Sequence, residues 1–223
     1  MGEKLVITVD GPVGAGKSTV SRALAGRLSY IYLDTGALYR AVAYTVAKEG
    51  ISPDNENHLS NIIGRTKIVF KNVEDRLRVF VNNEDVTEKI RTEEIGLLAS
   101  KVSAIPLVRN KLLSIQREDR EEGGIVAEGR DMGTVVFPDA DFKFFLDASV
   151  EERVKRRYDE LVMRGINSDY QQVERDLLIR DRQDRERKAA PLQTPRDAII
   201  IDSTDMTVSE VVEKMVTIIR RKS

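Results

Sequence analysis

Residues Gly11–Ser18 read GPVGAGKS, a complete G-x-x-x-x-G-K-[ST] pattern, and they constrain the fold more than any other stretch of this chain. The pattern follows the β-branched run Lys4–Asp10 and precedes Lys17–Leu28, where apolar residues recur at helical spacing. The run predicts a buried strand, and the spacing predicts a helix. A glycine-rich loop between a strand and a helix lets several backbone N–H groups converge on phosphate oxygens. The sequence therefore predicts a phosphate-binding loop.

The lysine and serine of this P-loop pattern predict a nucleoside triphosphate with magnesium. Lys17 is expected to bridge the β- and γ-phosphates, and the Ser18 hydroxyl to hold Mg²⁺ as the cofactor. A glycine-rich turn matching by chance is the alternative, and the predicted strand and helix on either side argue against it. The residues expected to bind ATP are Gly11, Pro12, Val13, Gly14, Ala15, Gly16, Lys17, Ser18 and Thr19.

Strand and helix patterns alternate along most of the remaining chain. Further strands are predicted over Tyr30–Asp34, Gly124–Ala127, Asp141–Leu146 and Ala198–Ile201. Further helices are predicted over Gly36–Lys48, from Ser149 onward, and over Thr207–Arg220, with Ser149 and Glu152 as a capping box. This alternation is typical of an α/β fold in which helices cover a parallel sheet. We expect the three-layer P-loop NTPase fold over a single domain, residues 1–223.

The middle of the chain breaks this alternation. Lys67–Lys71 and Arg76–Val81 are alternating runs separated by NVED, which predicts a hairpin. Helical patterns follow over Thr92–Ala104 and Pro106–Arg120. We expect a small antiparallel β insert within about 62–104 and a helical lid at about 152–172.

Composition excludes several classes of protein. There are no cysteines, and the single histidine, His58, lies in a polar run that favours a solvated loop or helix start over a ligand. With 36 basic and 37 acidic residues the net charge is −1, so no nucleic-acid partner is expected. No apolar run approaches the roughly 20 residues of a membrane span, and no signal-peptide pattern opens the chain. We expect a cytoplasmic monomer that does not contact a membrane.

Two further segments predict a second anion site. LDTGALYR places Thr35 and Arg40 just after a predicted strand, and AEGRDMGT places Glu128, Arg130 and Asp131 at the end of another. Open α/β sheets bind ligands at the carboxyl ends of their strands. The alternative for AEGRDMGT is a turn in which Arg130 and Asp131 simply pair with each other. A small-molecule kinase needs such arginines, whereas a switch GTPase needs an N-K-x-D motif that this sequence lacks.

The segments GPVGAGKST, LDTGALYR, GRDMGTVVFPDA and RDRQDRERKAAPL together resemble the bacterial cytidylate kinases, nucleoside monophosphate kinases with a P-loop. The resemblance implies transfer of a phosphoryl group from ATP to CMP or dCMP with Mg²⁺, so the expected partners are these nucleotides. The CMP-binding residues that the resemblance implies fall into three groups. At the acceptor phosphate they are Thr35, Arg40 and Arg130. Around cytosine they are Asp131, Arg109 and Arg187, and at the ribose they are Ser100, Arg180 and Asp184.

Residue chemistry supports part of this assignment. Cytosine carries an amino donor where uracil carries a carbonyl, so a carboxylate at Asp131 would match cytosine and oppose uracil. Arg180, Asp184 and Arg187 are spaced i, i+4, i+7 and share one face if the tract is helical. The alternative is a solvated helix with its own pairs, Asp181–Arg185 and Asp184–Lys188.

Phosphoryl transfer needs positioning and charge neutralisation more than a strong base. The residues expected to act in transfer are Lys17 and Arg130, with Arg153 and Arg157 from the lid; Arg156 is a third lid arginine, and surface pairing is the alternative for each. Asp147 is expected to hold the magnesium hydration shell through water, or else to cap the next helix. Glu128 is a second candidate for the magnesium role. The turn Asp202–Thr207 is expected to lie at the adenine.

Two other functions stay open at this point. One is a kinase for another anionic acceptor, such as shikimate, UMP or AMP. The other is a protein that uses bound nucleotide as a regulatory switch. The chain is longer than a shikimate kinase and carries the RDxxDRxxR tract, which argues against shikimate. ADP release with each candidate acceptor separates all three.

Overall fold

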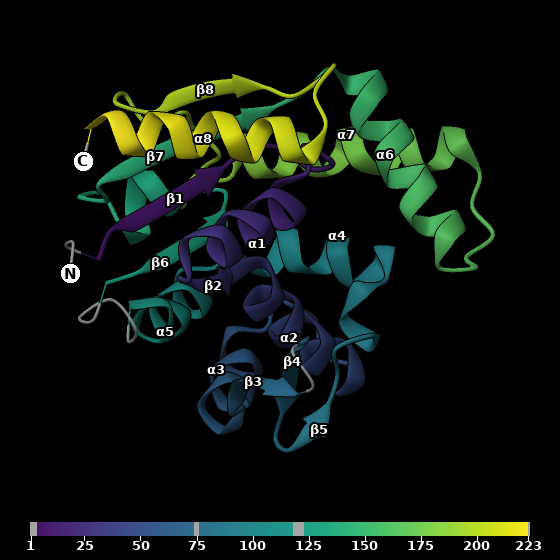
Figure 1. Cartoon of the computed structure of the whole chain (residues 1–223). Helices are drawn as coiled ribbons and strands as arrows, with labels where there is room; N and C mark the ends of the chain where they lie inside the picture. The colour runs from purple at the N-terminus through teal and green to yellow at the C-terminus, as the bar shows by residue number, and fades with distance from the viewer. Residues whose placement is uncertain (1–3, 74–75, 118–122, 223) are drawn as a thin grey trace. The chain divides into compact units, whose positions relative to one another are not determined.

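The computed structural model describes residues 4–73, 76–117 and 123–222 (Figure 1). The chain divides into two compact units. The first comprises Met1–Asp34 and Gln116–Ser223, and the second comprises Thr35–Ile115. The second unit contains all of the expected insert 62–104 and extends beyond it on both sides. Among the described residues, no helix combines the length and the apolar character that a membrane crossing requires.

The first unit is built on a five-stranded parallel sheet in the order β2-β6-β1-β7-β8. Its strands are β1 (Val6–Asp10), β2 (Ile31–Asp34), β6 (Ile125–Gly129), β7 (Phe142–Asp147) and β8 (Ile199–Asp202). The central strand β1 is buried along its whole length, as its β-branched sequence predicts. In the register Asp10 lies beside Gly129 and Asp34 beside Glu128, so the carboxyl ends of β1, β2 and β6 are level. The predicted α/β fold is confirmed.

Four helices and one π-helical turn complete this unit. They are α1 (Lys17–Leu28), α6 (Val150–Met163), α7 (Tyr170–Glu186), α8 (Val208–Lys222) and the turn Met132–Val136. Helices α1 and α8 share one hydrophobic core with the sheet, through residues such as Leu24, Phe144 and Met215. Helices α6 and α7 enclose a second, smaller core.

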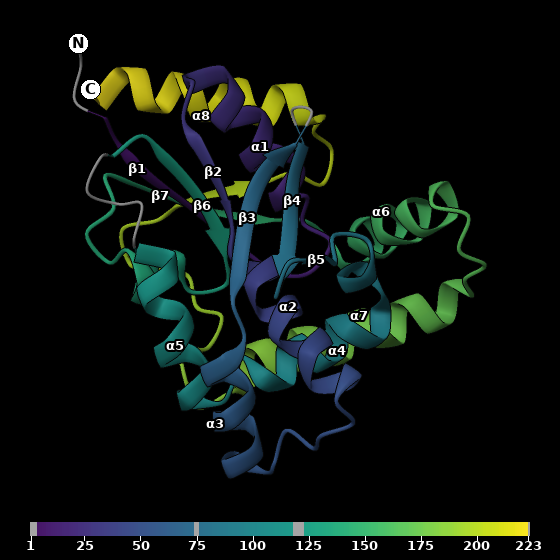
Figure 2. The same ribbon diagram turned by 90° about the horizontal axis from the view of Figure 1, so that it is seen from below.

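The second unit contains α2 (Thr35–Lys48), α3 (Glu56–Arg65), β3 (Ile68–Val73), β4 (Arg76–Val81), β5 (Glu84–Asp85), a 3₁₀ turn (Lys89–Arg91), α4 (Glu93–Val102) and α5 (Pro106–Arg117) except its last two residues. The three strands form an antiparallel sheet in the order β3-β4-β5, and Figure 2 shows β3 and β4 side by side. The apolar residues of α2, among them Leu38 and Val42, lie at the centre of this unit's core. The predicted antiparallel insert is therefore present.

Several local predictions need correction. Helix α3, strand β5 and the π-helical turn were not predicted; α3 begins in a polar run, where Asn55 accepts a hydrogen bond from the N–H of His58. The capping box is half formed, because Ser149 accepts from the N–H of Glu152 at 3.2 Å while the Glu152 carboxylate pairs with Arg156. Positions 74–75 of the hairpin and 118–120 of the predicted helix lie outside the described residues.

Candidate nucleotide site

The loop between β1 and α1 needs its glycines. Gly14 and Gly16 have φ angles of +76° and +86°, which side chains other than glycine rarely adopt. A Cβ atom on Gly11 would lie 2.0 Å from the carbonyl oxygen of Leu146 on β7. Helix α1 begins at Lys17 without a side-chain cap, so its first N–H groups point into the loop. This geometry suits the oxygens of a bound phosphate.

Lys17 is buried at the start of α1 and donates to the carbonyl of Pro12 at 2.6 Å. Burial, together with the nearby Arg130 guanidinium, lowers the pKa of Lys17 to about 7, against the opposing effect of Glu128. A phosphate group brought into the loop would favour the charged form of this lysine.

Two carboxylates lie at the level strand ends beside the loop. Glu128 is buried on β6, where its carboxylate accepts a hydrogen bond from the hydroxyl of Tyr32, and Asp34 is its neighbour on β2. Burial raises the pKa of Glu128, and the charge of Asp34 adds to the effect. The Ser18 side chain opposes this rise in the pKa of Glu128. The hydroxyl that is expected to hold magnesium therefore lies near a carboxylate.

Arg130 and Asp131, the adjacent charged residues in AEGRDMGT, each form an ion pair with another residue. Arg130 Nε donates to Asp184 Oδ2 on α7 at 2.7 Å. Asp131 Oδ1 is 3.3 Å from Arg187 Nη2, and both side chains are almost completely buried. The predicted helix is present and Arg180 is buried on it, but Arg187 is the residue that follows the last turn of α7. The structure thus brings GRD and the RDxxDRxxR tract together in the first unit.

Asp181 and Asp184, for which pairs along the tract itself were the alternative, form pairs with other elements. Asp184 pairs with Arg130, and Asp181 pairs with Arg153 on α6 at 2.5 Å. Arg157 pairs with Glu160 on its own helix, also at 2.5 Å. Whether Arg153 and Arg157 act in phosphoryl transfer stays a prediction.

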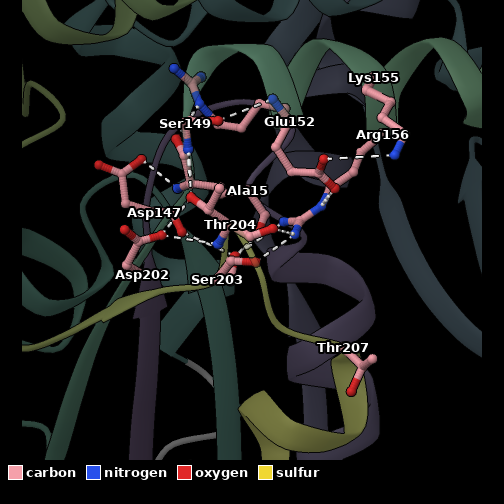
Figure 3. Close-up of polar contacts among 12 residues, drawn as sticks. Ala15, Asp147, Ser149, Glu152, Lys155, Arg156, Asp202, Ser203, Thr204 and Thr207 are labelled. Carbon is pink, nitrogen blue, oxygen red and sulfur yellow. Dashed lines mark hydrogen bonds and ion pairs between the residues drawn. The ribbon is translucent and has the colours of Figure 1, made fainter.

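Arg156 connects α6 to the turn after β8 (Figure 3). Its guanidinium donates to the carbonyl oxygen of Ser203 at 2.6 Å and to its hydroxyl at 3.1 Å. Ser203 in turn donates from its N–H, at 2.8 Å, to the carbonyl oxygen of Asp147 at the end of β7. The Asp147 carboxylate accepts from the N–H of Ala148, and α6 is capped by Ser149. Sequence reasoning missed the role of Ser203, since a serine in a turn carries no local signal for a distant arginine.

Four predicted residues lie in the second unit, on α2, α4 and α5. Thr35 opens α2 and is buried, and Ser100 lies on α4. Arg40 donates to the carbonyl oxygens of Ile90, at 2.9 Å, and Thr92, at 3.3 Å. Arg109 lies 5.7 Å from the centre of the Tyr39 ring. This unit therefore carries two arginines held by its own backbone and aromatic groups.

Comparison with known proteins agrees with this architecture. The cytidylate kinase family model matches residues 7–221. A cytidylate kinase from Citrifermentans bemidjiense is 47% identical over 98% of this chain and 94% of its own length. One from Anoxybacillus flavithermus is 46% identical over 100% and 99%. Among solved structures, a gluconokinase from Sinorhizobium meliloti shares the fold with a TM-score of 0.51, at 15% identity over 98% of this chain and 93% of that one.

The family match extends over residues 7–221, a range that includes the phosphate-binding loop and the buried contacts of Arg130 and Asp131. The near-complete coverage of both relatives leaves no large part of either unmatched. The chain belongs to the cytidylate kinase family.

Proposed function

We propose that this chain transfers the γ-phosphoryl group of ATP to CMP or dCMP and releases ADP with CDP or dCDP. The observation that carries the proposal is the pairing of Arg130 and Asp131 with α7, in the same unit as the phosphate-binding loop. A phosphate grip and a buried carboxylate on adjacent residues suit a nucleoside monophosphate. With its balanced charge, the chain is proposed to act as a cytoplasmic monomer without a nucleic-acid partner.

On the donor side, the loop Gly11–Thr19 binds ATP and Lys17 contacts its phosphates. The oxygens of Ser18, Glu128 and Asp34 fit Mg²⁺, which prefers hydroxyl, carboxylate and water ligands and takes few of them from protein. In this proposal Ser18 holds the ion directly, and the carboxylates, with Asp147 as a further candidate, hold its water. The ion would neutralise charge on the phosphates.

On the acceptor side, Arg130 binds the phosphate and Asp131 faces the amino group of cytosine. Asp131 is almost fully buried, so setting the carbonyl of uracil against its carboxylate opposes two acceptors with no donor between them, which costs about a hundredfold or more in affinity. The family resemblance adds to the CMP-binding set the residues Thr35, Arg40, Ser100, Arg109, Arg180, Asp184 and Arg187.

Transfer in this proposal is a matter of position and charge. The attacking phosphate oxygen is already anionic, so no general base is needed. Lys17 and Arg130 neutralise the two reacting phosphates, and the charges of the two groups influence each other in this structure. Arg157 on α6 is the lid arginine proposed to contact the transferring group.

The test is CMP-dependent ADP release from ATP–Mg²⁺, with the phosphorylated product identified by anion-exchange chromatography. We expect ADP and CDP in equal amounts, and little ADP when CMP is omitted. ADP release at the same rate without an acceptor would contradict the proposal and favour a nucleotide-dependent switch or a simple ATPase.

A further inference from the structure

Val13, in the middle of the phosphate-binding loop, is held by α6 and α7. Its N–H donates to Asp181 Oδ1 on α7 at 3.1 Å, and its carbonyl oxygen accepts from Arg153 Nη1 on α6 at 2.9 Å. Its side chain is part of the small hydrophobic core that these two helices enclose. Both polar groups and the side chain of this one loop residue are therefore engaged by the same pair of helices.

The two residues that hold Val13 also hold each other. Arg153 and Asp181 form an ion pair at 2.5 Å, with side chains 4% and 9% exposed. Arg153 Nε donates in addition to the carbonyl of Ala148, at 3.1 Å, after the end of β7. A buried ion pair stabilises a fold little by itself, because desolvation offsets the attraction. What this pair provides is a fixed arrangement of donors and acceptors around the loop.

The loop fits closely against this arrangement. A Cβ atom on Gly14 would lie 2.7 Å from the carbonyl oxygen of Arg153 and 2.9 Å from its Cβ atom. The backbone after Val13 therefore touches the first turn of α6 directly. A shift of Arg153 would move the loop residues whose N–H groups are aimed at phosphate.

One turn of α7 contacts both the phosphate-binding loop and the segment that carries Arg130 and Asp131. Asp181 binds the phosphate-binding loop at Val13, and Asp184, three residues later, pairs with Arg130 beside the proposed base-reading Asp131. Residues three apart on a helix are neighbours. The helix thus relates the position of the donor loop to that of the acceptor residues.

We infer that Asp181 and Arg153 are positioning residues for ATP, which hold the peptide of Val13 and with it the phosphate-binding loop. This inference rests on the proposed function, and it gives Arg153 a task other than contact with the transferring group. The hydrogen bonds described for this pair join it to the loop and to Ala148, whereas its link to the residues proposed for CMP runs along α7, so we expect its loss to act on ATP more than on CMP.

The main variant replaces both charges, as Asp181→Leu with Arg153→Met. Removing one charge alone leaves the other buried and unpaired, which unfolds many proteins, whereas two apolar residues of similar size are tolerated. A second variant, Arg153→Lys, keeps the positive charge but loses the planar fork that reaches Val13, Ala148 and Asp181 together. The matched control is Arg175→Met on α7, whose ion pair with Asp169 is exposed.

For the double variant we expect an apparent KM for ATP raised about tenfold or more, the size expected from lost charge-assisted hydrogen bonds, with the KM for CMP within about threefold. Arg153→Lys should also raise the KM for ATP, but by less, and Arg175→Met should have the KM values of the wild type. An unchanged KM for ATP in a folded double variant would overturn the inference. Equal increases for both substrates would overturn it too, since a purely structural pair affects both alike.

Direct binding separates this inference from the proposed function. Isothermal titration calorimetry with the magnesium complex of adenylyl imidodiphosphate, a non-hydrolysable analogue of ATP, needs no acceptor and no turnover. We expect about tenfold weaker binding to the double variant than to the wild type. If the wild type shows no CMP-dependent activity, the proposed function fails while this measurement still decides the inference. If the double variant does not fold, Arg153→Lys decides it, and wild-type affinity there would contradict it.

Discussion

Asp10, the last residue of β1, accepts a hydrogen bond at 2.8 Å from the backbone N–H of Gly133, in the π-helical turn that follows Asp131. The N–H of Met132 donates to the same carboxylate at 2.9 Å. Asp10 is completely buried and immediately precedes the phosphate-binding loop. One carboxylate therefore joins the strand that carries the donor loop to the segment that carries Arg130 and Asp131.

This carboxylate predicts a specific pH dependence of stability. Burial and the charge of Asp131 raise the pKa of Asp10 to about 6, against the opposing effect of the two backbone hydrogen bonds. The folded protein thus holds this proton at a higher pH than the unfolded chain, whose aspartates have a pKa of about 3.8. The free energy of unfolding contributed by Asp10 therefore falls as the pH rises from about 3.8 to about 6.

Asp10→Asn cannot titrate, so comparison with it isolates the effect. We expect the free energy of unfolding of the wild type, relative to Asp10→Asn, to decrease by about 2 to 3 kcal/mol between pH 4 and pH 7. Urea unfolding of both proteins at these two pH values measures it. A difference between the proteins that is the same at both pH values would show that Asp10 has an ordinary pKa.

Arg187 is predicted to act in CMP binding as well as in folding. Arg187→Met removes the guanidinium that pairs with the buried Asp131 carboxylate, and we expect a loss of about 3 kcal/mol or more in the free energy of unfolding. Arg187→Lys keeps a positive charge beside Asp131 but loses the bond that Arg187 Nε donates to the carbonyl of Ala190. We expect this second variant to regain most of the stability while its KM for CMP stays at least several-fold raised. If Arg187→Lys recovered both the stability and the wild-type KM for CMP, the role of Arg187 would be purely structural.

Arg156 and its neighbour Lys155 offer a matched pair on α6. Arg156→Met removes the hydrogen bonds to Ser203 that hold the turn after β8, the proposed adenine site, so we expect a several-fold higher KM for ATP. Lys155 is exposed and its ion pair with Glu152 is long, at 4.0 Å, so Lys155→Met should change nothing measurable. Steady-state kinetics with varied ATP measures both. Equal KM values for ATP would remove this turn from the donor site.

Replacing either of two glycines near the start of the chain by alanine is predicted to change the free energy of unfolding, in opposite directions for the two positions. Gly11→Ala places a Cβ atom 2.0 Å from the backbone of β7, and we expect a loss of more than about 3 kcal/mol in the free energy of unfolding. A Cβ atom on Gly26, within α1, would meet no neighbouring group within 4 Å, so Gly26→Ala should stabilise by roughly 0.5 to 1 kcal/mol. Thermal unfolding measures both changes. Similar melting temperatures for the two variants would contradict the close approach at Gly11.

Local sequence patterns were sufficient to predict the part of the first unit that is proposed to bind ATP, the phosphate-binding loop and helix α1. Helix α1 has its predicted bounds, Lys17–Leu28, because glycines before it and apolar spacing within it act over a few residues. The π-helical turn escaped prediction because Asp10, more than a hundred residues away, accepts its N–H groups. Helix α3 was not predicted because its first turn is polar and because Leu59 and Ile63 pack in the second unit's core, far along the chain from most of its other members.

The charged tract on α7 shows the same limit at the level of the site. Sequence spacing offered Asp181–Arg185 and Asp184–Lys188 as pairs, and the structure pairs Asp181 with α6 and Asp184 with Arg130. Intrahelical partners are visible in sequence because they recur every three or four residues. Partners on other elements depend on how helices pack, and a single sequence does not encode that locally.

The most direct test of the central claim is the acceptor preference of the wild type and of Asp131→Asn. With ATP–Mg²⁺ in excess, ADP release is measured for CMP and for UMP as kcat/KM. We predict a preference for CMP of at least about a hundredfold in the wild type, and a preference reduced at least about tenfold in Asp131→Asn, with the KM for ATP within about threefold of the wild type. Equal kcat/KM values for CMP and UMP in the wild type would contradict the claim.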